Sequence, residues 1–141
     1  MKKSLLLVAV VLLLAGCTTS KSYTLKVTTE KEEEIKVKLN TTDGLDMKQD
    51  GNELIYSKDD KEVALSNFQH KANCDAIFEQ IATIDTVEVI DEKDDLIFYF
   101  YEGEYIHLSR IEKGNACFAI KSTDSEDIVK EIYENITVTV E

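Results

Sequence analysis

The sequence predicts an α+β fold in which a mostly antiparallel β-sheet of about seven to nine strands is covered by two helices. Three observations support this prediction. Several segments alternate apolar and polar residues, which is typical of strands with one buried face. Two other segments carry apolar residues at spacings of three, four and seven, which is typical of amphipathic helices. Short runs rich in Gly, Asp and Lys separate these segments and indicate turns.

The predicted strands follow from the alternation. Apolar side chains alternate with Lys and Thr over residues 23–28 and 35–39, and an acidic run at residues 30–34 is the expected turn between them. Gly44 and Gly51 indicate further turns, because glycine accepts backbone angles that other residues avoid. The strands expected after these two cover a short segment at 45–47 and residues 53–57, 62–68, 84–90, 96–101, 104–111, 115–121 and 136–140. Turns between them are expected at residues 58–61, at residues 91–95 and at Gly103.

Two helices are predicted, at residues 73–82 and 124–134. Asn73 is the expected N-cap of the first helix, whose apolar stripe is Cys74, Ile77, Phe78 and Ile81. Thr123 and Glu126 form a T-x-x-E pattern, which predicts a capping box for the second helix. The second stripe consists of Ile128, Val129, Ile132 and Tyr133, and Asn135 is expected to end the helix.

The order of elements resembles one known fold. A late helix that carries the chain back to an edge strand is similar to the PsbP-like fold of photosystem extrinsic subunits and related bacterial lipoproteins. This resemblance concerns element order alone, and it implies no function for any residue.

The first residues of the chain have the pattern of an export signal. Lys2 and Lys3 are followed by eleven uncharged apolar residues, 5–15. As a helix, that run would reach only about 17 Å, whereas the hydrocarbon core of a bilayer is about 30 Å thick. The run is therefore too short to cross a membrane, and polar residues follow it directly.

The end of this run resembles the lipobox of bacterial lipoprotein precursors. Leu14, Ala15, Gly16 and Cys17 place an aliphatic residue and two small residues before a cysteine. The resemblance implies that a diacylglyceryl group is attached to Cys17 and that the signal is cut just before it. Residues 1–16 would then be a signal peptide, residues 17–22 the lipidated cysteine with a short tether, and residues 23–141 a single globular domain. The alternative is an ordinary signal peptide, or a small membrane anchor, in which Cys17 has no role.

Charge and composition limit the partners. The signal holds two of the 16 basic residues and none of the 28 acidic ones, so the mature chain carries 14 basic residues against 28 acidic and a net charge of −14. Such a balance argues against nucleic acid and against docking on anionic lipid, which both require basic surfaces. Proline is absent and 15 of the 16 basic residues are Lys. This composition is typical of AT-rich genomes and predicts a low-GC Gram-positive host, with a Gram-negative envelope as the alternative.

Cys74 and Cys117 remain after Cys17 is lipidated. An even pair of cysteines in an exported domain suggests a disulfide, and two buried free thiols are the alternative. His70 lies four residues before Cys74, which is a zinc-ligand spacing, but two ligands do not make a zinc site. The acidic loop at residues 43–53 departs from the EF-hand pattern because Lys48 stands at a ligand position. We expect no metal and no cofactor.

One group of residues could form a ligand site. Tyr105 and His107 alternate on one predicted strand, and a neighbouring strand could bring Tyr99 and Tyr101 beside them. These four side chains are the candidate ligand-binding face, and packing in a core is the other interpretation.

The sequence favours a binding module over an enzyme. It contains no G-x-S-x-G, no H-E-x-x-H and no phosphate-binding loop, so no catalytic residue is assigned. We therefore expect a membrane-anchored lipoprotein outside the cytoplasm, whose partners are the membrane, through Cys17, and an envelope protein or small ligand. The alternatives are a cell-envelope hydrolase that uses carboxylates with His107 and an accessory subunit of an envelope transporter.

Overall fold

The computed structural model describes residues 19–28, 32–111 and 113–141. The predicted signal peptide, Cys17 and part of the first predicted turn lie outside the described residues. Within the described ranges no helix has the length and apolar character needed to cross a membrane.

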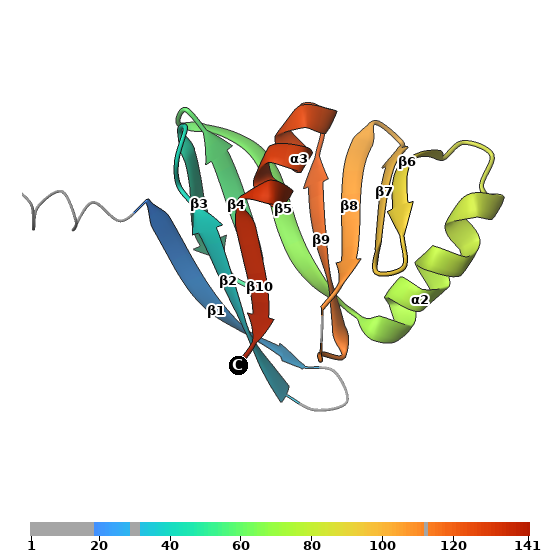
Figure 1. The fold of residues 1–141 in the computed structure, drawn as a ribbon, viewed down its shortest axis with the longest axis horizontal. Helices are drawn as coiled ribbons and strands as arrows, with labels where there is room; N and C mark the ends of the chain where they lie inside the picture. Colours follow the sequence, from blue (N-terminus) through green and yellow to red (C-terminus); the bar gives the residue numbers. More distant parts are fainter. Residues whose placement is uncertain (1–18, 29–31, 112) are drawn as a thin grey trace, which may run out of the picture.

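The predicted α+β class is confirmed, with two antiparallel sheets in place of one (Figure 1). In the described part of the chain the larger sheet has the strand order β3-β4-β5-β9-β8-β7-β6, and the smaller has the order β1-β2-β10. The strands are β1 (Ser20–Thr28), β2 (Glu32–Asn40), β3 (Leu45–Asp50), β4 (Glu53–Lys58), β5 (Lys61–His70), β6 (Glu88–Lys93), β7 (Leu96–Tyr101), β8 (Glu104–Arg110), β9 (Ala116–Ser122) and β10 (Ile136–Val140). The helices are α2 (Lys71–Gln80), the short 3-10 helix η1 (Ile81–Thr83) and α3 (Glu126–Glu134).

The smaller sheet and α3 cover one face of the larger sheet, which we call the α3 face. Leu25 of β1, Val37 of β2 and Ile132 of α3 belong to the same buried cluster as Phe118 of β9. The expectation of a single sheet was wrong because β10 does not join the larger sheet. It pairs with β2 from Ile136 to Val140, so the inward faces of these strands form a second layer of the core.

Helix α2 covers the opposite face, which we call the α2 face. Cys74 of α2 and Ile81 of η1 are buried with Leu108 of β8 and with Cys117 and Ala119 of β9. Figure 1 shows α2 beside strands β6 to β8, at the far end of the molecule from the smaller sheet. Both predicted helical stripes therefore face the core, although Tyr133 at the end of the second stripe is 38% exposed.

The predicted N-caps are wrong at both helices. His70 caps α2, because its Nδ1 accepts a hydrogen bond of 3.1 Å from the backbone N–H of Ala72, and the helix begins before Asn73. Ser125 caps α3, because its Oγ accepts a bond of 3.2 Å from the N–H of Ile128, so the T-x-x-E pattern at Thr123 forms no capping box. Asn135 ends α3 as predicted.

Several strand boundaries also differ from the prediction. β2 begins at Glu32, so residues 32–34 pair with β1 and do not belong to the turn predicted at residues 30–34. β1 begins at Ser20, so residues 20–22 belong to the sheet and not to a tether. β6 covers Glu88–Lys93, because the turn before β7 takes only residues 94–95 and leaves residues 91–93 free to pair with β7. The turn predicted at residues 58–61 is present but shorter: Lys58 ends β4, Lys61 begins β5, and Asp59 and Asp60 form the turn, both at positive φ.

A buried hydrogen bond offers a test of the core on the α3 face. The hydroxyl groups of Tyr56 and Ser66 lie 2.8 Å apart, and both residues are at most 1% exposed. Tyr56→Phe would leave the Ser66 hydroxyl buried without its partner, so we expect the free energy of unfolding to fall by about 1–3 kcal/mol. Combining Tyr56→Phe with Ser66→Ala should cost less than the sum of the two single changes in urea unfolding. Additive costs would contradict the coupling.

Candidate functional site

The predicted ligand-binding face does not exist as one surface. The β7–β8 register pairs Phe98 with His107 and Tyr99 with Ile106. Directly opposite residues of an antiparallel pair share a face, so Tyr99 lies on the α2 face while His107 lies on the α3 face. Tyr101 packs with Tyr99, and Tyr105 packs with the cluster that contains Phe98. The four residues are thus divided between two separate cores, and the prediction was wrong.

His107 is buried and uncharged under α3. It is 4% exposed, and its ring lies 3.8 Å from the ring of Tyr133 and 5.6 Å from that of Phe98. Among the described residues, none forms a hydrogen bond with its Nδ1. Burial lowers the pKa of His107 to about 4, because the charged form loses its water; interaction of the ring with its own backbone and attraction to Asp91 oppose this only in part. No hydrogen bond to a carboxylate is found for this ring among the described residues. The side chain therefore lacks the geometry that a hydrolase base would need.

The two internal cysteines meet between α2 and β9. Their Cα atoms lie 6.3 Å apart, and the structure joins their Sγ atoms as a disulfide. Both residues are fully buried among apolar side chains of the α2 face. The bond would fasten helix α2 to a central strand of the larger sheet.

The other sequence-level candidates have structural roles. His70 is the helix cap described above and lies outside any metal cluster, since the described residues contain no group of three or more potential ligands. In the acidic loop, the carboxylate of Asp46 lies 2.6 Å from Nζ of Lys21 and accepts the backbone N–H of Met47. That carboxylate is thus already paired.

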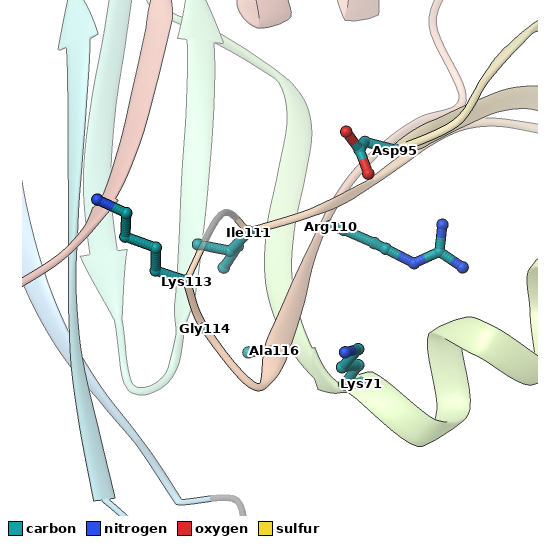
Figure 2. Close-up of a pocket in the computed structure, with 7 residues that line it drawn as sticks. All are labelled: Lys71, Asp95, Arg110, Ile111, Lys113, Gly114 and Ala116. Atoms are coloured by element: carbon teal, nitrogen blue, oxygen red, sulfur yellow. The ribbon is translucent and has the colours of Figure 1, made fainter.

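A pocket of about 360 Å³ contains three basic side chains, Lys71, Arg110 and Lys113 (Figure 2). Arg110, the one arginine of the chain, donates from Nε and Nη2 to Asp75 at 3.2 and 3.0 Å and from Nη1 to the carbonyl of Asp94 at 2.7 Å. Its guanidinium also lies 4.0 Å from the centre of the Phe78 ring. In Figure 2 the side chain of Lys113 points away from Arg110. The cations do not converge, so this pocket is not a built anion site.

A second groove, of about 400 Å³, lies beside β10. Ile136, Thr137 and Val138 line one wall. The other lining residues come from the turn before β7, the end of β8, β9 and α3; they are Asp95, Leu96, Ser109, Arg110, Ile111, Phe118 and Tyr133. We call this space the β10 groove. Its volume is in the range of ligand sites, and one wall is a sheet edge. The sequence analysis missed it, because a groove between two sheets requires knowing that β10 leaves the larger sheet.

The buried histidine predicts a pH dependence of stability. The unfolded chain binds a proton at an ordinary histidine pKa of about 6.5, whereas folded His107 does so only near pH 4. The contribution of neutral His107 to the free energy of unfolding is therefore fully present above pH 6.5. It is lost as the pH falls towards 4, and the total loss is on the order of 3 kcal/mol. His107→Phe should remove this component of the unfolding free energy. Identical pH profiles of the unfolding free energy for the native and His107→Phe chains would contradict the assignment.

The cysteine pair predicts a dependence on reductant. Closing a loop across a sequence separation of 43 stabilises a chain by about 4 kcal/mol in the chain-entropy model. We expect reductant to lower the unfolding midpoint of the native chain and to leave that of the Cys74→Ser, Cys117→Ser double variant unchanged. Alkylation of these two thiols in the unreduced, unfolded chain would show instead that they are free.

Comparison with known proteins finds no family model, no curated relative and no solved structure that matches this chain. The PsbP-like resemblance in element order therefore has no support from these comparisons.

Proposed function

We propose that the protein is a lipid-anchored binding module on the outer side of the cytoplasmic membrane. The observation that carries the proposal is the order of parts at the N-terminus: a basic start, a short apolar run, Leu14-Ala15-Gly16-Cys17, and a folded strand from Ser20 onwards. Only residues 18–19 separate the proposed lipid attachment from the first strand. An anchor at Cys17 would therefore hold a folded domain against the membrane surface.

The length of this connection is shorter than the sequence analysis assumed. Three residue steps from Cys17 to Ser20 span at most about 11 Å when fully extended. The end of the smaller sheet that contains Ser20 also contains Asn40 and Asn135, because Ser20 pairs with Asn40 and the Asn40 N–H donates to the carbonyl of Asn135 at 2.8 Å. This end would face the bilayer, and the ends of β1 and β10 would point away from it.

A binding role is favoured over catalysis by the described residues. His107 is enclosed by aromatic rings, Arg110 is paired with Asp75, and the described residues contain no cluster of potential metal ligands. The β10 groove, in contrast, offers an apolar space beside a strand edge, which is suited to binding a partner.

Lipid labelling in a bacterial host tests the anchor. We expect the native chain to incorporate labelled palmitate and to begin at Cys17 after processing. Cys17→Ala should lose all label, since it removes the sulfur atom that accepts the lipid. The Cys74→Ser, Cys117→Ser double variant should keep the label, which makes it the matched control. Native chain that stays unlabelled and unprocessed would overturn the proposal.

A further inference from the structure

We infer that the β10 groove binds an extended, basic peptide segment of a partner protein, which adds to β10 as a further antiparallel or parallel strand. The inference rests on the proposed binding function and names the kind of partner. An uncharged open strand edge, an apolar groove and Asp95, which forms no ion pair within the described residues, lie together at this site.

The backbone of β10 has groups that point into this space. The Asn40 N–H bonds to the Asn135 carbonyl, and the Glu141 N–H bonds to the Glu34 carbonyl. The odd-numbered residues of β10 therefore direct their backbone groups towards β2, and Ile136 and Val138 direct theirs away from it. In the described part of the chain β10 pairs with no strand besides β2, so this edge is open.

The composition of β10 distinguishes it from the other edge strands. The remaining edges of the two sheets are β1, β3 and β6, and each carries charged side chains within the strand. β6 also contains an irregular register between Val89 and Asp91. Charges and bulges are the usual protection of an edge against pairing with another chain. β10 has the sequence Ile-Thr-Val-Thr-Val and carries neither charge nor proline, so its edge is unprotected.

The apolar lining of the β10 groove favours a partner with apolar side chains. The lining includes Leu96, Ile111 and Phe118, each at most 9% exposed, and Tyr133, which is 38% exposed. Alternate side chains of an added strand would face this apolar lining. The larger sheet stands opposite the free edge of β10 (Figure 1).

The charge of the groove indicates a basic peptide. Its two charged lining residues are Asp95 and Arg110. Arg110 is already paired with Asp75, and no ion pair within the described ranges involves the exposed Asp95 carboxylate. The mature chain as a whole carries a net charge of −14. Local and global charge therefore both favour Lys or Arg in the partner.

Binding of synthetic peptides to the full lipidated protein in detergent tests the inference. The probe is a fluorescent peptide of alternating valine and threonine with lysines at both ends, measured by anisotropy. Its controls are a copy with glutamates at the ends and a copy N-methylated at alternate residues, which cannot donate along one edge. We expect each control to bind at least about fivefold more weakly than the probe, since one backbone hydrogen bond or one charge contact is lost.

Two variants of the protein locate the site. Val138→Pro removes the N–H that faces the groove without removing a bond to β2, so it should weaken probe binding by about fivefold or more. Thr139→Ala, an exposed side-chain change on the same strand at a residue that does not line the groove, should bind as the native chain does. If Val138→Pro lowers the unfolding midpoint, Asp95→Asn replaces it as the test and should reduce the preference for lysine over glutamate ends.

Three results would overturn the inference. These are no binding of the probe, equal binding of the N-methylated copy, and a concentration-dependent dimer that Val138→Pro abolishes, which would make a second copy the occupant. The lipid-labelling experiment is separate from these. Labelled protein that fails to bind peptide refutes only the inference, and unlabelled protein that binds peptide refutes only the anchor.

Discussion

The fold depends on β9, a strand that is buried on both faces. Residues 116–120 are all at most 2% exposed. Phe118 and Ile120 belong to the core on the α3 face, whereas Cys117 and Ala119 belong to the core on the α2 face. A strand of this kind is stable only when both faces of its sheet are covered, because each uncovered apolar side chain would cost about 1.5–3 kcal/mol. The chain supplies α2 for one face and α3 with the smaller sheet for the other.

This requirement explains why the protein has two sheets. Helix α3 alone presents three buried residues to the larger sheet, Ile128, Val129 and Ile132. The remaining apolar surface, on β3 and β4, is covered by Leu25, Ile35, Val37 and Leu39 of the smaller sheet. The last strand returns to β2 and not to the larger sheet, so it extends this cover. The same arrangement leaves one edge of β10 facing a groove between the two layers.

Strands and helices could be predicted from the sequence because their patterns are local. The helix stripes, the β4–β5 turn and the end of α3 at Asn135 need only neighbouring residues. To predict which of Tyr99, Tyr101, Tyr105 and His107 share a face of the sheet, the exact length of the turn between β7 and β8 was needed as well. Glu102 and Gly103 form a two-residue turn, both at positive φ, which pairs Tyr101 with Glu104 and fixes every pair after it. Counted from that turn, Tyr99 cannot share a face with His107.

The start of α2 and the groove could not be predicted for a different reason, because they depend on contacts between distant segments. Helix α2 begins where β5 ends, and the Lys71 N–H donates to the carbonyl of Asn115, a residue of the loop before β9. That loop is itself held by Glu33 of β2, whose buried carboxylate accepts the Asn115 N–H at 3.1 Å. The capping preference of Asn73 is a local property and does not include these contacts. Tertiary contacts therefore set the start of the helix.

The distribution of charge fits a domain that is held close to a membrane. The three strands of the smaller sheet carry four lysines and three glutamates, so this sheet is close to neutral, and most of the acidic residues lie in the larger sheet, α3 and the turns. Under the proposed anchor at Cys17, the near-neutral sheet is the part that the tether holds against the lipid headgroups. Repulsion between anionic lipid and exposed acids is screened over about 8 Å at physiological salt. If the proposed anchor and the proposed basic partner are both correct, the acidic part of the domain would lie where that partner is attracted without competition from the membrane surface.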